Sequence, residues 1–267
     1  MILADLHIHS TFSDGKLTIP ELVDLFGTRG FGAIAITDHL CDSETIIGKA
    51  AAYLGRTLTP ATYPLYIQIL KSEAERAWRL YRMVVIPGFE LTQNSIANSR
   101  SSHVLGLGVN EFVHANGDPK LLARAIRATG ALAIVAHPVW TRKVEKQTFR
   151  IWDRREELAN EFDAWEAASG PFIFDEVLNS GLPMVASSDL HHPRQITSWK
   201  TVFTCERSQE AILDAIRRQD LSFRFYQEDA YDMRRWVDLR GLGTGFNADT
   251  LRHYLGAPGS ESGSAAS

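Results

Sequence analysis

Residues 2–10 decide the fold, and they read Ile-Leu-Ala-Asp-Leu-His-Ile-His-Ser. The run from Ile2 to Ile8 is mainly apolar, which predicts a buried β-strand. His7 and His9 are two positions apart at its end, and side chains at i and i+2 of a strand point to the same face. This stretch therefore predicts a core strand that ends in two imidazoles side by side.

The same order of elements recurs along the rest of the chain. Further strands are expected at 33–37, 83–86, 104–109, 131–136, 162–167, 184–187 and 200–204, and helices at 20–29, 118–129 and 208–219. Thr18 is the expected N-cap of the first helix, with Pro20 in its first turn. Strands that alternate with helices and consist of continuous Ala, Val and Ile predict a parallel sheet covered by helices. Closure of that sheet into a barrel does not follow from periodicity.

Two segments differ from this alternation. Residues 43–82 are mostly helical, with interruptions expected near Thr59-Pro60 and at Pro64, and we interpret them as a helical insertion over the mouth of the domain. Residues 256–267 consist mainly of Gly, Ser, Ala and Pro and have little to bury, so we expect a disordered tail.

The composition excludes several classes of protein. With 267 residues, 45% of them hydrophobic, the chain can bury a large core, and its net charge of -4 gives no basic balance that would point to nucleic acid. Cys41 and Cys205 are the only cysteines, which argues against a disulfide framework or a thiolate zinc site. No apolar run approaches the ~20 residues of a membrane helix, and the N-terminus lacks a signal-peptide pattern. We therefore expect a cytoplasmic protein with no membrane partner.

Histidines and carboxylates gather at the ends of the predicted strands. The set comprises His7, His9, His39, Glu90, His103, His137, Asp189 and His191. Because the carboxyl ends of strands in an α/β sheet converge on one edge, we expect these side chains to meet in space. Imidazole nitrogens and carboxylate oxygens bind Zn, Mn or Fe, and a set without cysteine fits catalytic ions better than a structural zinc. Asp14, by contrast, has a plain role available in the turn with Gly15.

These residues stand in motifs that resemble those of the PHP (polymerase and histidinol phosphatase) domain family. The motifs are Asp5-Leu6-His7-Ile8-His9-Ser10, Ser13-Asp14-Gly15, Ile36-Thr37-Asp38-His39, Glu90, His103, Ala136-His137-Pro138 and Ser188-Asp189-Leu190-His191. They occur in the family's order, and the match runs from the first strand to about Gln219. One departure is Leu40, where many members carry Asp.

The resemblance implies a distorted (β/α)7 TIM-like barrel over residues 1–255, with a metal site at the C-terminal ends of the strands. It implies two or three divalent ions, which the sequence does not resolve among Zn, Mn and Fe. By motif, one ion would be held by His7, His9, Glu90 and Asp189, a second by Glu90, His103 and His137, and a third by Asp14, His39 and His191.

The chain looks closest to the stand-alone phosphoesterases of this family, which implies hydrolysis of a small phosphomonoester or nucleotide by a metal-activated water. His39, His191 and Asp38 are the candidate catalytic groups that relay a proton to the leaving oxygen. Arg194, Arg100, Arg142 and Lys143 lie in loops near ligand positions and are candidates for binding substrate phosphate.

Other functions remain open at this point. The site can instead serve a phosphodiesterase or exonuclease that acts on short oligonucleotides or 3',5'-bisphosphate nucleotides. Similar metal clusters also occur in amidohydrolases, and some PHP modules attached to polymerases are non-catalytic scaffolds. Every ligand motif is intact here, which favours an enzyme. The sequence does not determine the substrate or the oligomeric state.

Overall fold

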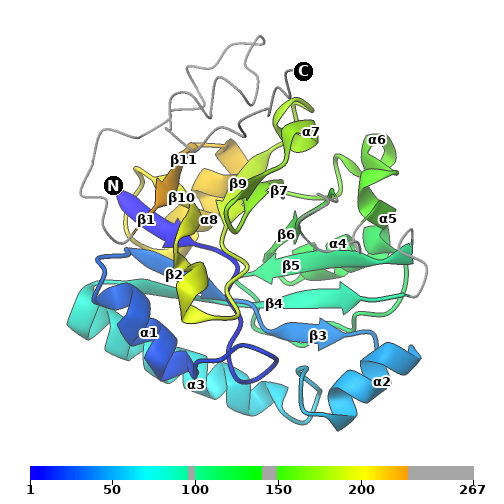
Figure 1. The fold of residues 1–267 in the computed structure, drawn as a ribbon, viewed down its shortest axis with the longest axis horizontal. Coiled ribbons are helices and arrows are strands. Elements are labelled where there is room, and N and C mark those ends of the chain that lie inside the picture. Colours follow the sequence, from blue (N-terminus) through cyan, green and yellow to red (C-terminus); the bar gives the residue numbers. More distant parts are fainter. Residues whose placement is uncertain (96–99, 140–148, 228–267) are drawn as a thin grey trace, which may run out of the picture.

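The structure, a computed structural model, describes residues 1–95, 100–139 and 149–227. Its centre is a curled mixed sheet of the half-barrel kind, with helices packed on its outer side (Figure 1). The strands are β1 Ile2–Asp5, β2 Ala33–Ile36, β3 His39–Cys41, β4 Val84–Gln93, β5 Ser102–Leu107, β6 Leu132–Val135, β7 Ala164–Ser169, β8 Phe172–Ile173, β9 Met184–Ser187, β10 Ser198–Phe203 and β11 Leu221–Tyr226. They are ordered β11-β10-β1-β2-β4-β5-β6-β7-β8, with β3 paired to β4 and β9 to β7.

The expectation of a parallel sheet is wrong for part of this order. Strand β5 runs antiparallel to both β4 and β6, and β10 runs antiparallel to both β1 and β11. Only residues 94–101 separate β4 from β5, which is too short for the crossover that a parallel pair needs. As a result, the start of β5, with His103, lies at the same edge as the end of β4.

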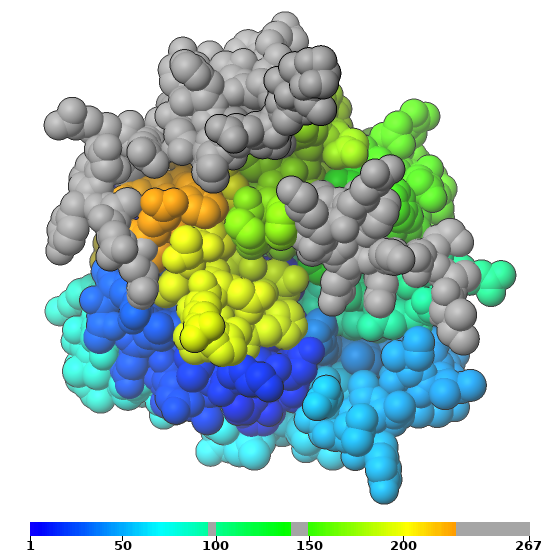
Figure 2. Space-filling view, viewed as in Figure 1, coloured from blue at the N-terminus to red at the C-terminus, as the bar shows by residue number. Residues whose placement is uncertain are grey.

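The segments that follow β1 and β9 pair with each other and curl the sheet. Ile8 forms a parallel bridge with Leu190. The His9 N–H donates to the Leu190 carbonyl at 2.8 Å, and the Leu190 N–H donates to the His7 carbonyl at 3.1 Å. In the space-filling view the yellow segment around residue 190 lies against the blue N-terminal segment (Figure 2). Asp189 is thereby brought next to His7.

Helices cover the sheet much as the periodicity predicts. They are α1 Ile19–Gly27, α2 Ile46–Tyr53, α3 Tyr63–Tyr81, α4 Pro119–Ala128, α5 Phe149–Trp152, α6 Arg155–Leu158, α7 Asp175–Leu178 and α8 Gln209–Arg218, with a 3-10 helix, η2, over Pro193–Ile196. Helix α1 begins at its expected N-cap: the Thr18 hydroxyl accepts from the Glu21 N–H, while the Glu21 carboxylate accepts from the Thr18 N–H. Its buried face, which includes Leu22 and Phe26, packs into the core.

Residues 43–82 carry two helices with different surroundings. Helix α3 packs on the outer side of the sheet, where the buried Tyr66 hydroxyl lies 2.9 Å from the carbonyls of both Ile36 and Gly88. Pro64 lies in the first turn of α3 and does not interrupt it, because the first turn leaves backbone N–H groups unpaired in any case. Helix α2 instead buries only Gly48.

Several elements were not expected from the sequence: the short strands β3 and β8, the C-terminal strand β11, and the one-turn helices α5 to α7. Strand β11 pairs with β10 along its whole length. Within the described residues, no helix is both long enough and apolar enough to cross a membrane. The predicted tail at 256–267 lies outside the described residues.

Candidate metal centre

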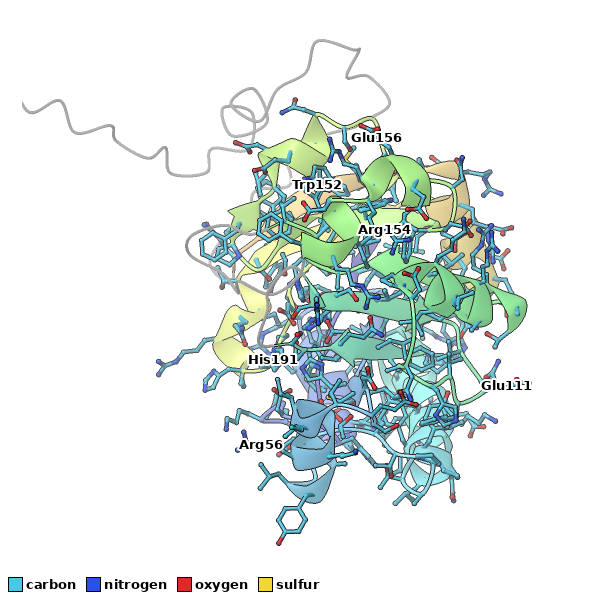
Figure 3. The ribbon with its side chains drawn as sticks, turned by 90° about the vertical axis from the view of Figure 1, so that its right-hand side faces the viewer. Arg56, Glu111, Trp152, Arg154, Glu156 and His191 are labelled. Carbon is cyan, nitrogen blue, oxygen red and sulfur yellow. The ribbon has the colours of Figure 1, made fainter. Side chains whose placement is uncertain are left out.

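Nine side chains from different parts of the chain come together in one cluster. One of them, His191, is labelled in Figure 3. They form four overlapping groups whose ligand atoms lie within 4.8 Å of one another: His9, Asp14, His39 and His191; His7, His137 and Asp189; His7, His9 and Glu90; and Glu90, His103 and His137. The sequence had divided the same nine residues slightly differently. In the structure His9 also joins the Asp14 group, and Asp189 lies nearer to His137 than the motifs implied.

Glu90 is the centre of the cluster. Five imidazoles lie around its buried carboxylate: His39 Nδ1 at 2.6 Å, His103 Nδ1 at 2.9 Å, His137 Nε2 at 3.4 Å, and Nε2 of His7 and of His9 at 3.7 Å. The sequence placed Glu90 after a strand that ended at Ile86, but β4 continues to Gln93. Pairing of β3 with this extension places His39 directly opposite Glu90.

Asp189 reaches the cluster from a turn. Strand β9 ends at Ser187, and Asp189 has a φ of 53°, a left-handed conformation that few residues other than glycine adopt. Its Oδ1 lies 3.4 Å from Nε2 of His7 and 3.3 Å from Nε2 of His9. His137 has a φ of 26° as well, so two members of the cluster occupy uncommon backbone conformations, which often mark functional sites.

Asp14 lies at the mouth of the cluster. Its Oδ1 is 3.2 Å from Nε2 of His191 and 3.5 Å from Nε2 of His39. The turn that carries Asp14 folds tightly against the segment that follows β1: a Cβ added to Gly15 would lie 2.2 Å from the His9 carbonyl oxygen. Glycine at position 15 therefore lets Asp14 approach the imidazoles.

The polar atoms of these residues fit a cation. Within the part of the chain that the structure describes, buried atoms without a hydrogen-bond partner include His7 Nε2, both ring nitrogens of His9, Asp14 Oδ1, both Glu90 oxygens and His103 Nδ1. Buried polar atoms in proteins are nearly always hydrogen-bonded, so such a concentration needs an explanation. Divalent metal ions would supply the missing partner, and the donor set of imidazoles and carboxylates suits them.

The electrostatics hold Glu90 and His9 in the protonation states that metal ligands need. Burial alone would raise the pKa of Glu90, but the surrounding imidazoles, His103 and His39 foremost, lower it well below its usual range. Burial, together with the neighbouring His39 and His191, lowers the pKa of His9 to about 3. At neutral pH the Glu90 carboxylate is therefore ionised and the His9 ring is neutral, as ligands must be.

Asp38 does not fit the proton relay expected for it. Its buried carboxylate accepts hydrogen bonds from the Ser10 N–H at 2.8 Å, the Ser10 hydroxyl at 2.6 Å and the Ser13 hydroxyl at 2.6 Å. It belongs to none of the four groups. These contacts favour a role in holding the loop that leads from His9 to Asp14.

The predicted phosphate-binding residues are less well defined. Arg194, in η2, and Arg100 are both exposed, and no ion pair of either guanidinium occurs within the described residues. Arg142 and Lys143 lie outside the described residues. The sequence did not identify Lys16, which is exposed next to Asp14 and whose N–H donates to the His191 carbonyl at 2.8 Å.

Polar residues that contact the imidazoles were also missed or left undecided. Thr92 Oγ1 lies 2.8 Å from Nδ1 of His39, and Asn94 Oδ1 lies 2.8 Å from Nε2 of His103. Thr92 follows Glu90 by two positions, and this spacing on a strand was the signal that could have found it. No signal in the sequence marks Asn94.

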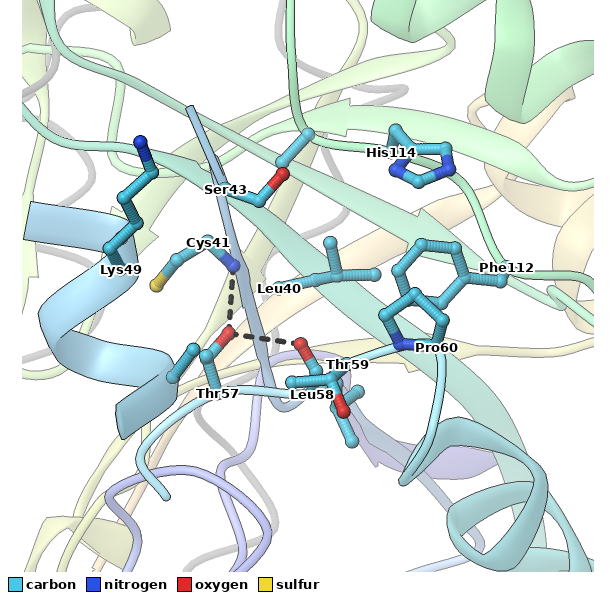
Figure 4. Close-up of a pocket in the computed structure, with 13 residues that line it drawn as sticks. Leu40, Cys41, Ser43, Lys49, Thr57, Leu58, Thr59, Pro60, Phe112 and His114 are labelled. Atoms are coloured by element: carbon cyan, nitrogen blue, oxygen red, sulfur yellow. Dashed lines mark hydrogen bonds between the residues drawn. The ribbon is translucent and has the colours of Figure 1, made fainter. Parts of the chain in front are cut away.

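A separate cavity of about 200 Å³ lies beyond β3, between α2 and residues 112–115 (Figure 4). His39 faces the cluster while Leu40, the next residue of the strand, lines this cavity. The Cys41 N–H donates to the Thr57 hydroxyl at 2.8 Å, and burial raises the pKa of the Cys41 thiol to about 11. That thiol is therefore a poor nucleophile at neutral pH.

Comparisons with known proteins find related sequences and a related fold. The PHP domain model matches residues 5–116, and the PHP-associated model matches residues 178–221. Phosphoribosyl 1,2-cyclic phosphate 1,2-diphosphodiesterase of Eggerthella lenta is 30% identical over 123 residues, which cover 46% of this chain and 35% of that protein. The match thus spans about a third of that relative.

Among solved structures, a two-domain protein from Bacteroides vulgatus that contains a predicted PHP-like metal-dependent phosphoesterase superposes with a TM-score of 0.64. The alignment has 20% identity and covers 96% of this chain and 69% of that one, which shows a common fold. The chain is thus similar to the PHP domain family over residues 5–116 and to the PHP-associated model over residues 178–221.

Proposed function

We propose that this chain is a metal-dependent phosphoesterase that hydrolyses a small phosphomonoester or nucleotide. The observation that carries the proposal is the set of overlapping His and carboxylate groups around Glu90. Within the described residues, His7, His9, Asp14, Glu90 and His103 each have a buried atom in this set without a hydrogen-bond partner. Because the groups overlap, neighbouring cations would share ligands. Glu90, for example, belongs to two of the groups. Closely spaced divalent cations are typical of phosphate-ester hydrolysis.

The nine residues would hold the cations, and a subset would also act on the substrate. When bound, divalent ions neutralise phosphate oxygens and lower the pKa of a water molecule toward neutrality. The side chains of His39 and His191 are 15% and 29% exposed, whereas those of His7 and His9 are fully buried. His39 and His191 are therefore the imidazoles best placed to pass a proton to a leaving oxygen.

The number and identity of the cations are part of this proposal. We assign two or three ions, Zn, Mn or Fe, because mixed imidazole and carboxylate sets accept all three metals. We further assign the family's seven-unit barrel to the strands β1, β2, β4, β5, β6, β7 and β9, with the Ile8–Leu190 bridge as its closure. The barrel would extend over residues 1–255 with 43–82 as an insertion, and a cytoplasmic location stays a prediction.

A second candidate function is hydrolysis of a small phosphodiester. It is favoured by the relative from Eggerthella lenta, whose name describes cleavage of a ribose 1,2-cyclic phosphate. The most exposed members of the cluster are Asp14 at 36%, His191 at 29% and Asp189 at 23%, so a substrate would reach the cluster from their side.

A substrate panel tests the proposal. Protein reconstituted with Mn or Zn is offered a chromogenic phosphomonoester, a chromogenic phosphodiester, a ribose 1,2-cyclic phosphate, a 3',5'-bisphosphate nucleotide, a short oligonucleotide and a chromogenic amide. Chelator-sensitive hydrolysis of a phosphate ester is the expected result, and the preferred ester distinguishes the two candidates. A Glu90→Gln protein purified in parallel controls for contaminating phosphatases. Absence of phosphate-ester turnover with metal shown to be bound would overturn the proposal.

A further inference from the structure

Glu166, on β7, contacts two members of the cluster, His7 and His137. Its buried Oε1 lies 3.0 Å from Nδ1 of His7, and its Oε2 accepts the backbone N–H of His137 at 2.7 Å. The register between β7 and β9 shifts just after Glu166, between Glu166 and Ala168. Such bulges re-aim side chains next to functional sites. One carboxylate therefore supports ligand positions that follow two different strands, β1 and β6.

The contact with His7 has a consequence for the other nitrogen of its ring. An ionised carboxylate only accepts hydrogen bonds, so the proton of a neutral His7 lies on Nδ1 and the lone pair lies on Nε2. Nε2 is 3.4 Å from Asp189 Oδ1 and 3.7 Å from Glu90 Oε2, and it is buried with no hydrogen-bond partner in the described part of the chain.

We infer that Glu166 is a positioning residue, which holds His7 in the tautomer that presents the Nε2 lone pair to a divalent cation. The inference rests on the metal centre of the proposed function. Carboxylates behind metal-bound imidazoles commonly have this effect, and their removal weakens metal binding by about 10- to 100-fold. Here the same carboxylate also holds the N–H of His137, whose φ of 26° needs support from its surroundings.

A comparison with His103 supports this assignment. Nε2 of His103 lies 2.8 Å from Asn94 Oδ1, and its Nδ1 faces Glu90 at 2.9 Å. The polar partner thus contacts Nδ1 of His7 but Nε2 of His103. In each ring the nitrogen without that partner points toward the cluster, so the two imidazoles present opposite nitrogens to the same centre.

Replacement of Glu166 by Gln tests the tautomer with little change of volume. The N–H of His137 can only donate, so the amide oxygen of Gln must face it. The amide NH2 group then faces Nδ1 of His7, and a neutral ring must accept there and carry its proton on Nε2. That tautomer cannot bind a cation through Nε2. If Glu166 served only in packing, replacing it by Gln would leave the metal affinity unchanged.

The experiment measures affinity for Mn or Zn by competition with a chromogenic chelator, in wild type, Glu166→Gln, His7→Ala and the double variant. The Glu166→Gln protein should bind its weakest-held cation about 10- to 100-fold less tightly than wild type. The double variant should bind no more weakly than His7→Ala alone, because Glu166 acts through His7. Glu73→Gln, which removes a carboxylate paired with Arg76 on α3, is the matched control and should bind as wild type does.

Two outcomes would overturn the inference while the proposed function stands: wild-type affinity in Glu166→Gln, or losses that add in the double variant. Wild-type protein that binds no cation would instead remove the proposed metal centre itself. A measurement without variants covers the case in which Glu166→Gln fails to fold. Long-range ¹H–¹⁵N spectra of the zinc-loaded wild type should show His7 protonated at Nδ1 and zinc-bound through Nε2, and the reverse assignment would exclude the role.

Discussion

Replacing Glu90 by Gln removes one negative charge from the point where five imidazoles meet, and it keeps the size of the side chain. Glu90 belongs to two of the four ligand groups, and both of its oxygens are buried without a hydrogen-bond partner in the described residues. The group formed with His7 and His9 would retain two imidazoles and no carboxylate. Loss of a residue that only supports a metal ligand weakens metal binding by about 10- to 100-fold. We therefore expect that loss of a shared ligand weakens binding of these cations by about 100-fold or more.

The size of the effect follows from binding linkage. A cation at about 100 times its Kd stabilises the wild-type protein by about 2.7 kcal/mol, if it binds only the folded state. For a domain of this length, each kcal/mol raises Tm by about 2–4 °C, which gives a shift of about 5–11 °C. If Glu90→Gln binds about 100-fold more weakly, the same cation concentration adds about 0.4 kcal/mol, or about 1 °C.

The assay compares each protein with itself, metal-free and metal-loaded, by thermal unfolding at one cation concentration. This removes the separate effect of the lost charge on the metal-free fold, where Glu90 interacts with His103 and His39. Elemental analysis of the same samples should show fewer ions per chain in the variant. The Glu73→Gln control should keep the full shift. A Glu90→Gln protein with the wild-type metal-induced shift and metal content would refute the assignment of Glu90 as a shared ligand.

Three further substitutions test other parts of the structure. Lys200→Met removes the ammonium that lies 2.7 Å from the fully buried Asp5 carboxylate, and denaturant unfolding should show a loss of about 3–5 kcal/mol; a loss below about 1 kcal/mol would contradict a buried ion pair there. Gly15→Ala places a Cβ 2.2 Å from the His9 carbonyl oxygen, so the loop must move and metal content by elemental analysis should fall, whereas full metal content would show that the turn tolerates a side chain. Arg194→Ala should raise KM for the phosphate ester several-fold at unchanged metal content, and unchanged kinetics would remove Arg194 from the substrate site.

The position of most elements was predictable because the signals are local. Apolar runs marked the buried strands β1, β2, β6 and β9, and the capping residues Thr18 and Asp118 marked the starts of α1 and α4. The direction of β5 was not predictable from its own residues. It depends on the short connection from β4, which excludes a parallel crossover.

The candidate ligands were also predictable as a list, because His7, His9 and the other members stand in motifs at strand ends. Their grouping was not. His9 contributes to the Asp14 group because the turn at Gly15 folds back onto the backbone of His9, a contact that spacing along the chain does not predict. Asp38 shows the converse, since it stands in a motif but is committed to the hydroxyls of Ser10 and Ser13.

By itself, the sequence determined which chemical groups the site contains and near which strand ends they lie, since residue type and periodicity are local properties of the chain. The tertiary structure alone decided that Glu90 would stand among five imidazoles and that Glu166 would lie behind His7, 159 positions away. It also decided which ring nitrogen of each histidine faces the cluster. These features depend on how the strands pair and where the sheet curls, and both are set by packing between segments that are far apart in the chain.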